Sequence, residues 1–203
     1  HLLVAHGKAV HKFRELGING EIGFAPNTTW KEPFSNQEKD IEASQREIGF
    51  LADWFFEPVF KGQYPDYLVD WFAKKGAHLT IQKDDMSYIQ EKIDFVGINY
   101  YTGNLVRYKE NHGLLDSEDI DMGYNYTDIH WPIYPEGFYK ILTYVQEKYS
   151  GDTPLYITEN GACYNEEVEN EEVQDFDRIA YMRIHLAALL RSIKSGVPIK
   201  GYM

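Results

Sequence analysis

A carboxylate that directly follows an apolar run is the clearest chemical feature of the sequence. Residues 154–161 read Pro-Leu-Tyr-Ile-Thr-Glu-Asn-Gly. The run after the proline favours a buried parallel strand, and Asn160-Gly161 favours a tight turn that closes it. In a barrel or sheet of βα units, side chains at the C-terminal end of such a strand face the reaction cleft. Glu159 is therefore a candidate nucleophile or general base. The same pattern also fits a glutamate that a turn holds or that caps the next helix.

A second strand is predicted at residues 93–102, which read Ile-Asp-Phe-Val-Gly-Ile-Asn-Tyr-Tyr-Thr. This strand delivers Asn99 and Tyr101 to the same end of the sheet as Glu159. An amide and a phenol beside a carboxylate form a polar cluster that is suited to a hydroxylated ligand. Asn99 could instead serve only as a turn former.

Two other sets of residues could do chemistry, but their surroundings argue against it. Cys163 is the only cysteine, and no basic residue that could activate a thiolate lies beside it in the sequence. His1, His6 and His11 are five residues apart, so each step carries them about 140° around a helix and they do not form a metal pair on one face. We therefore predict no metal site and no cofactor.

The composition limits the classes of partner. The chain has 203 residues, of which 43% are hydrophobic and 15% aromatic, and its net charge is −12. The acidic balance argues against nucleic acid or an anionic membrane as a partner, while the aromatic content suits a carbohydrate or another ring-stacking ligand. No apolar run approaches the roughly 18 residues of a membrane span, and no signal-peptide pattern is evident. With a single cysteine, a reducing compartment is favoured, so we predict a cytoplasmic location.

Predicted strands alternate with predicted helices along the chain. The strands are expected at residues 18–25, at residues 93–102, in the run that ends at Glu159, and at residues 198–203. The helices are expected at residues 2–16, from a capping box at residues 35–38 to about residue 60, at residues 65–75, in a short segment before Ile93, at residues 138–149, and in a long segment that ends at Gly196.

Three intervening stretches are predicted to be irregular, at residues 26–34, 107–130 and 165–177. Asn27 lies in the first of them, at the C-terminal end of a strand, where ligand-binding groups commonly gather. The long last helix is expected to bury six apolar residues, namely Ile179, Met182, Leu186, Leu189, Leu190 and Ile193. The alternation indicates a parallel α/β fold, but only four strands are visible, whereas a closed barrel has eight.

Several motifs together resemble a known family. Residues 157–161, Ile-Thr-Glu-Asn-Gly, are similar to the nucleophile motif of glycoside hydrolase family 1, the β-glucosidases and their relatives. The supporting segments follow in the order of that family, and they are residues 94–102, Trp131 with residues 134–137, Arg178-Ile179 with Tyr181 and His185, and Gly201-Tyr202. The resemblance covers essentially the whole chain.

The resemblance implies a TIM-type (β/α)8 barrel, of which residues 1–203 form one partial domain with strands five to eight. It also implies roles for single residues. Glu159 matches the nucleophile, and Tyr101 matches the tyrosine that donates a hydrogen bond to it. Asn99 lies beside them, and Trp131 matches the aromatic platform under the leaving sugar or aglycone. Asn27 corresponds to a loop that contributes polar contacts to the substrate.

Two departures from the family pattern bear on activity. A retaining glycosidase needs a second carboxyl group, which the family carries in an Asn-Glu-Pro motif at the end of strand four, and no Asn-Glu-Pro occurs here. The tryptophan-rich segment that follows strand eight would lie beyond Met203. His130 stands where the family often has a small residue, so we expect a different entrance to the site. The resemblance thus implies a retaining β-glycosidase acting on β-D-glucosides or oligosaccharides, whose isolated 203 residues are inactive or nearly so.

Two alternatives stay open at this point. The chain could be a non-catalytic sugar-binding or assembly module, because four strands leave open sheet edges and an uncovered interior that favour self-association of half-barrels. It could also belong to a 6-phospho-β-glucosidase, whose phosphate-binding residues would lie past Met203.

Overall fold

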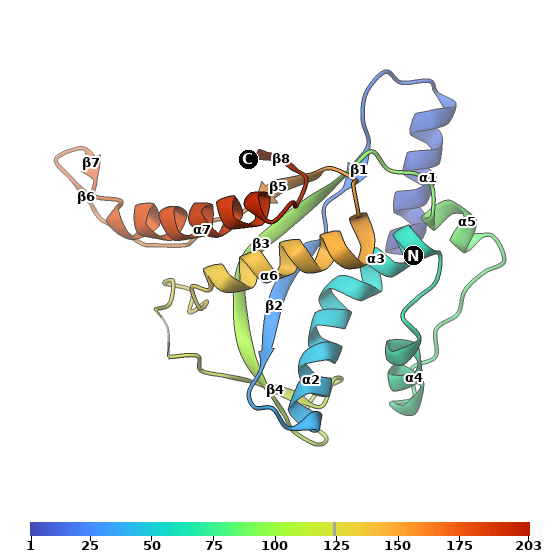
Figure 1. Ribbon diagram of the computed structural model, residues 1–203, viewed down its shortest axis with the longest axis horizontal. Helices are drawn as coiled ribbons and strands as arrows, with labels where there is room; N and C mark the ends of the chain where they lie inside the picture. Colours follow the sequence, from blue (N-terminus) through green and yellow to red (C-terminus); the bar gives the residue numbers. More distant parts are fainter. Residues whose placement is uncertain (124) are drawn as a thin grey trace.

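The computed structural model describes residues 1–123 and 125–203 as a mostly parallel sheet with helices packed on it (Figure 1). Strands β1, β3, β5 and β8 follow one another across the sheet, and β2 and β4 also pair with β3. Within this sheet, the pairings of the described strands are parallel except that of β4 with β3. The strands are β1 (Gly23–Phe24), β2 (Asn27–Pro33), β3 (Phe95–Tyr108), β4 (Ser117–Ile120), β5 (Leu155–Glu159) and β8 (Ile199–Tyr202).

The helices alternate with these strands, as the sequence predicts for parallel α/β units. Two of them end in a π-helical turn, η1 after α2 and η2 after α6. The helical segments are α1 (Leu2–Glu15), α2 (Glu38–Ile48), η1 (Gly49–Asp53), α3 (Trp54–Lys61), α4 (Asp66–Lys74), α5 (Asp85–Ile89), α6 (Pro135–Val145), η2 (Gln146–Ser150) and α7 (Phe176–Lys194).

The core lies between the sheet and the helices on one of its faces. Alternate residues of β3, Val96, Ile98 and Tyr100, are fully buried, and the Tyr100 ring stacks on Phe138 of α6 at 5.0 Å between centroids. Phe138 is one of four fully buried residues at helical spacing on α6, the others being Ile141, Leu142 and Val145. Because side chains alternate along a strand, the intervening residues of β3 turn to the opposite face of the sheet.

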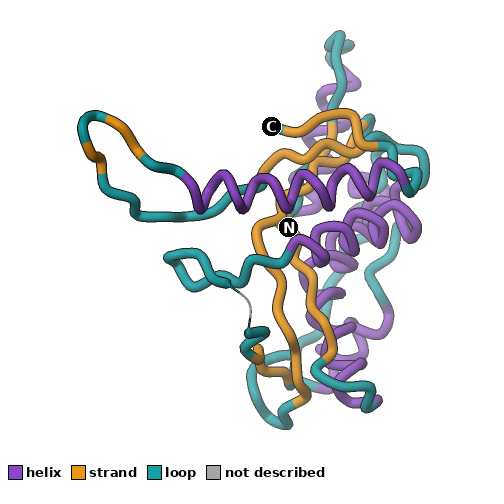
Figure 2. The backbone as a smooth tube through the Cα atoms, turned by 60° about the vertical axis from the view of Figure 1, so that its left-hand side comes forward, coloured by secondary structure: helices purple, strands orange, loops and turns teal. Residues whose placement is uncertain are grey.

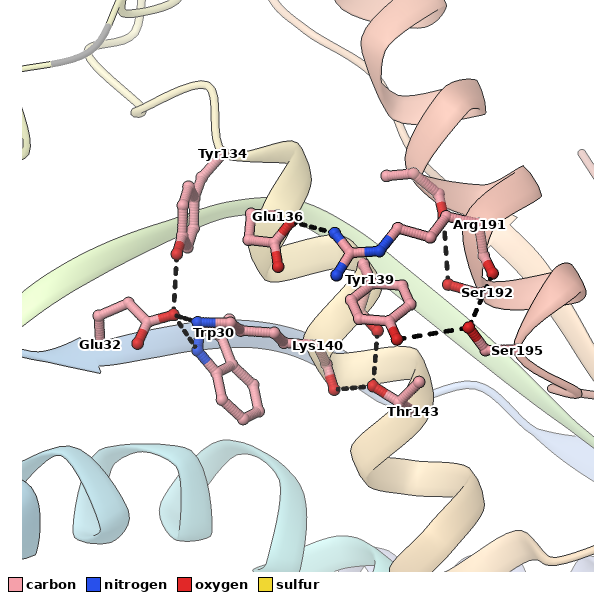
Figure 3. A network of polar contacts seen from close by, with 11 residues as sticks. Trp30, Glu32, Tyr134, Glu136, Tyr139, Lys140, Thr143, Arg191, Ser192 and Ser195 are labelled. Atoms are coloured by element: carbon pink, nitrogen blue, oxygen red, sulfur yellow. Dashed lines mark hydrogen bonds and ion pairs between the residues drawn. The ribbon is translucent and has the colours of Figure 1, made fainter.

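Polar side chains attach α6 to the strand beneath it and to the helix beside it (Figure 3). Glu32 of β2 accepts a hydrogen bond from the Tyr134 hydroxyl at 2.8 Å and forms an ion pair with Lys140 of α6. Arg191 of α7 pairs with Glu136 of α6 at 2.6 Å. These contacts fix the direction in which α6 and α7 cross the sheet.

Strand β2 corrects the prediction that residues 26–34 are irregular. Six of its seven residues pair in parallel with β3, with a register shift between Thr28 and Trp30. The bulge and the terminal Pro33 break the alternation of apolar and polar residues, which is the pattern that identifies a strand in a sequence. Conversely, the strand predicted at residues 18–25 is reduced to the two residues of β1.

The predicted capping box at residues 35–38 does not form. Helix α2 begins at Glu38 with Gln37 at the N-cap position, and no side chain caps it. The Ser35 hydroxyl donates instead to the Asp40 carboxylate at 2.6 Å. In a capping box the serine oxygen would accept a hydrogen bond from the backbone N–H three residues on, whereas here it accepts one from the backbone N–H of Gln37 at 3.2 Å.

The prediction that α7 buries six apolar residues is largely wrong. Leu189 is buried, but Ile179, Leu186, Leu190 and Ile193 are between 42% and 51% exposed. The buried positions are instead Tyr181, His185, Leu189 and Ser192. Apolar residues occur nearly all around this helix, so their spacing alone could not identify the face that packs.

The two remaining irregular stretches contain short strands. In the stretch 107–130, β3 continues to Tyr108 and pairs with the antiparallel β4, while residue 124 lies outside the described residues. In the stretch 165–177, β6 (Val168–Glu169) and β7 (Glu172–Val173) form a small hairpin. This hairpin and the N-terminal end of α7 extend away from the sheet (Figures 1 and 2).

Candidate active site

Three polar residues lie side by side on neighbouring parallel strands, at the level where β5 ends and β2 begins. Asn27 of β2 is in register with Asn99 of β3, and Asn99 is in register with Glu159 of β5. Residues that are paired in register point to the same face of a sheet, and adjacent strands are about 4.8 Å apart. The sequence thus correctly places Asn99 and Glu159 together, and Asn27 joins them as a strand residue rather than as a loop residue.

Tyr101 contacts Glu159 directly. It lies two residues after Asn99 and therefore on the same face of β3. Its hydroxyl donates a hydrogen bond to Oε2 of Glu159. This bond to Glu159, together with burial and the charge of the carboxylate, raises the pKa of Tyr101 to about 12. The phenol therefore stays protonated at neutral pH and remains a hydrogen-bond donor to the carboxylate.

Asn99 is oriented by its neighbour on β5. The β3–β5 register shifts between Ile98 and Asn99, which leaves Thr158 as an extra residue just before Glu159. The Thr158 hydroxyl donates to Oδ1 of Asn99. Asn99 is thus attached through its side chain to the residue that precedes Glu159, so the amide and the carboxylate keep a fixed relation.

Trp131 lies over the same end of β3. Its ring is 42% exposed and its centroid is 5.7 Å from that of the Tyr101 ring, at an interplanar angle of 55°. The Thr102 hydroxyl donates to the carbonyl oxygen of Pro132 at 2.8 Å, which holds the loop against the strand. An exposed indole beside a carboxylate offers a flat apolar surface for the face of a bound ring.

The family model for glycosyl hydrolase family 1 matches residues 1–203. The chain belongs to glycosyl hydrolase family 1. This confirms the predicted resemblance and the predicted α/β fold of the TIM-barrel type.

Relatives within family 1 are similar over part of their length. The chain is 36% identical to the beta-glucosidase A of Acetivibrio thermocellus, over 99% of this chain and 45% of that protein. It is 40% identical to a 1,4-beta-D-glucan glucohydrolase of Thermotoga neapolitana, over 99% of this chain and 47% of that protein. The solved structure of the family 1 b-glucosidase from Thermotoga maritima has a TM-score of 0.92 at 40% identity and is covered to 45% by this chain. The chain therefore spans about half the length of the family 1 relatives that it matches.

A cavity of about 400 Å³ opens beside Trp131. His130, which the sequence identifies as unusual for family 1, forms part of its wall and stacks on Tyr126 at 4.4 Å and 8°. His130 has a left-handed backbone with φ of 61°, a conformation that a histidine adopts more readily than a branched residue does. The prediction that His130 affects the entrance to the site is consistent with this position, and its effect on ligands stays a prediction.

A group of side chains behind Glu159 was not predicted as part of the site. Asn160, Tyr181 and Tyr202 form hydrogen bonds with one another and with the main chain of β3. The sequence suggested only a turn for Asn160 and only family resemblance for the two tyrosines. Polar residues on the packed face of a helix, such as Tyr181 on α7, are the signal that could have identified this group.

The structure bears on the predictions about a metal site and a membrane span, but not on the predicted location in the cell. Within residues 1–123 and 125–203, no three side chains of histidine, cysteine, aspartate or glutamate are grouped as metal ligands. In the same described part of the chain, no helix has the length and apolar character needed to cross a bilayer. The cytoplasmic location, the self-association of half-barrels and the single partial domain stay predictions.

Proposed function

We propose that this chain is the part of a retaining β-glucosidase that carries the catalytic nucleophile, and that the nucleophile is Glu159. The contact between the Tyr101 hydroxyl and Oε2 of Glu159 is the observation that carries the proposal. An exposed carboxylate at a strand end, oriented by a phenol and flanked by an amide and an indole, is suited to attack on a sugar. Membership of glycosyl hydrolase family 1 and the names of the relatives support the same reaction.

In the first step, a carboxylate oxygen of Glu159 forms a bond to the anomeric carbon of the sugar. The bond from that carbon to the leaving oxygen breaks, and its electron pair goes to the leaving group. The product is a glycosyl ester of Glu159. In the second step, water gives a proton to the second carboxyl group while its oxygen attacks the same carbon from the side opposite the ester bond. This releases the carboxylate of Glu159, so that two inversions give net retention. Tyr101 holds Oε2 throughout, which leaves Oε1 as the attacking oxygen.

The neighbouring side chains then have separate tasks in binding a β-D-glucoside or an oligosaccharide. The amides of Asn99 and Asn27 can each donate to and accept from sugar hydroxyl groups. Trp131 provides the surface on which the leaving sugar or aglycone stacks. Because two strand spacings amount to about 10 Å, Asn27 and Glu159 contact different parts of the ligand.

The second carboxyl group of the mechanism has to come from outside these 203 residues. Retention needs two carboxyl groups about 5 to 5.5 Å apart, and the one that protonates the leaving group contributes about 10² to 10⁴-fold in rate. The Asn-Glu-Pro motif that carries this group in family 1 is not in the sequence. We expect the isolated chain to be inactive on unactivated disaccharides.

Covalent trapping tests the proposal. The complete protein that contains this chain is treated with a 2-deoxy-2-fluoro-β-glucoside that has a good leaving group, and the labelled peptide is identified by mass spectrometry. The fluorine destabilises the positive charge at the anomeric carbon, so the ester forms but is hydrolysed slowly. A label on Glu159 is expected, and a label on another carboxylate would overturn the assignment. The 6-phosphorylated form of the same reagent, used as a matched probe, decides whether the enzyme is a 6-phospho-β-glucosidase.

A further inference from the structure

The backbone pairing between β3 and β5 stops before it reaches the residue that touches Glu159. The last pair in register is Asn99 with Glu159, while Tyr101 lies two residues further along β3. On its other edge β3 pairs with β2 at Tyr100 and again at Gly103, and the register shifts between these two pairs, so Tyr101 is not among the residues paired in register with either strand. The position of the Tyr101 hydroxyl therefore depends on what else holds the main chain of β3 at this point. A displacement of that main chain by about 1 Å would break the hydrogen bond to the carboxylate.

Two side chains continue the connection where the ladder ends. The amide Nδ2 of Asn160 donates to the carbonyl oxygen of Tyr100 at 2.7 Å. The hydroxyl of Tyr181 donates to the carbonyl oxygen of Tyr101 at 3.0 Å. The two side chains are also linked to each other, because Nδ2 of Asn160 donates to the Tyr181 hydroxyl oxygen at 3.1 Å. The residue that follows β5 and a residue of α7 thus supply side-chain hydrogen bonds to two consecutive carbonyl groups, where the backbone pairing with β5 has ended.

The network itself is rigidly supported. Tyr181 is 1% exposed, and its ring stacks on His185 at 3.9 Å and 23°. On the other side, the Tyr202 hydroxyl donates to Oδ1 of Asn160 at 3.0 Å, which fixes the orientation of the amide. Burial raises the pKa of Tyr181 well above its ordinary value, so its hydroxyl remains a donor. Buried networks of this kind, in which the members hold one another, have one preferred arrangement.

We infer that Asn160 and Tyr181 are positioning residues, which fix the main chain at Tyr100 and Tyr101 so that the Tyr101 hydroxyl stays on Glu159. The inference rests on the proposed function of Glu159. Neither residue is assigned a contact with substrate. Their effect on the rate acts through Tyr101, and this distinguishes them from residues that only stabilise the fold.

A double-mutant cycle on the complete protein tests this inference. The variants are Tyr181→Phe, Tyr101→Phe and the double variant, and the quantity measured is kcat/KM for 2,4-dinitrophenyl β-glucoside, whose leaving group needs no protonation. We expect Tyr101→Phe to lower kcat/KM by about 10- to 100-fold, the range for a hydrogen bond to a charged group. Tyr181→Phe is expected to lower it by about 10-fold, while the inhibition constant of glucose changes by less than about twofold.

The double variant decides the outcome. If Tyr181 acts through Tyr101, the double variant has the kcat/KM of Tyr101→Phe within about twofold. If the two losses multiply instead, Tyr181 does not act through Tyr101, and the inference is wrong. The proposed function has a separate test, because an active Glu159→Gln variant would contradict the role of Glu159 itself, whereas an unaffected Tyr101→Phe variant would overturn only the inference about Tyr181.

A matched control and a second variant keep the result clear. Tyr149→Phe likewise removes one tyrosine hydroxyl, which donates to Asp53 at 2.7 Å and not to β3, and it should leave kcat/KM unchanged within about twofold. If Tyr181→Phe fails to fold, Asn160→Asp replaces it in the cycle. This variant keeps the acceptor for Tyr202 but loses the amide donor to Tyr100. We therefore expect that adding Asn160→Asp to Tyr101→Phe lowers kcat/KM no further. Multiplied losses with Asn160→Asp overturn the inference equally.

Discussion

Glu159 and Asp53 both receive hydrogen bonds from tyrosine hydroxyls, but under opposite conditions. Glu159 is exposed at the end of β5, and Tyr101 donates to one of its oxygens. Asp53, at the end of η1, is 1% exposed. It accepts four hydrogen bonds at 2.7 to 2.8 Å, two to each oxygen, from Tyr67, Tyr144, Tyr149 and Lys148.

The environment of Asp53 makes it a structural anchor. An ionised carboxylate has about four acceptor positions, and the four donors fill them. Burial alone would raise the pKa of Asp53, but the hydrogen bonds from Lys148 and the three tyrosines outweigh it and hold the pKa below its ordinary value. Since the donors belong to α4, α6 and η2, the charge joins three helical segments at one point.

The comparison shows that a tyrosine beside a carboxylate does not by itself indicate catalysis. What separates the two sites is how many acceptor positions are filled and whether the group is open to a ligand. A saturated, buried carboxylate stabilises the fold, because its negative charge is balanced inside the protein. An exposed carboxylate held by one phenol keeps a defined orientation and can still react with a ligand.

The largest effect is expected when Glu159 is replaced, and this effect is on the rate and not on stability. Glu159→Gln removes the nucleophile and should lower kcat/KM of the complete protein for an aryl β-glucoside by about 10⁴-fold or more. Because the side chain is exposed, the melting temperature should stay within about 2 °C. A variant with more than about one hundredth of the activity would show that Glu159 is not the nucleophile.

The buried carboxylate should behave in the opposite way. Asp53→Asn leaves Lys148 without its charged partner and should lower the free energy of unfolding by about 3 to 5 kcal/mol, measured by urea denaturation. The activity per folded molecule should be unchanged. Glu57→Gln is the matched control, because Glu57 accepts a single hydrogen bond from Tyr149 at 3.1 Å, and a loss of about 1 kcal/mol or less is expected. Equal losses in both variants would contradict the anchoring role of Asp53.

The region behind Glu159 should respond to pH in a range of its own. His185 is fully buried between Tyr181 and α6, and burial lowers its pKa to about 4, although a hydrogen bond with the carbonyl oxygen of Tyr181 opposes this. The pKa of a histidine in the unfolded chain is about 6.5. As the pH falls from 6.5 to 4, the unfolded state takes up a proton that the folded state does not, so about 3 kcal/mol of stability is lost.

The variant His185→Phe checks this assignment. It keeps an aromatic ring against Tyr181 and has no group that titrates. Urea denaturation at a series of pH values should therefore give a flatter dependence between pH 6.5 and 4 for the variant than for the natural chain. Parallel curves for the two proteins would mean that His185 is not the group responsible.

The two regions also differ in how far the sequence reveals them. Glu159, Asn99 and Tyr101 were predicted because each lies in a short run of strand-forming residues, and parallel strands bring their C-terminal ends to one edge. The Asp53 site was not predicted, since its donors follow it by 14 to 96 residues and none of them has a local pattern. The same reason explains the wrong face of α7 and the unrecognised β2, because a packed face or a bulged pairing depends on the neighbour that it meets.

The smallest expected effect is on stability at acid pH, where Asp53 titrates in a lower range than His185. The pKa of Asp53 is lowered in the folded state, so the stability that the group contributes is complete above its unfolded pKa of about 3.8. As the pH falls below that value, the unfolded state is protonated first, and stability declines by at most about 1.4 kcal/mol per pH unit until the folded pKa is reached. In a His185→Phe background, from which the higher range is absent, adding Asp53→Asn should make the decline below pH 3.8 less steep, while the other carboxylates whose pKa is lowered in the folded state, such as Glu32 and Asp94, keep their share of it. If stability declines equally with and without Asp53→Asn, other carboxylates produce the decline. The buried Asp53 would then be no more sensitive to acid than the exposed carboxylates.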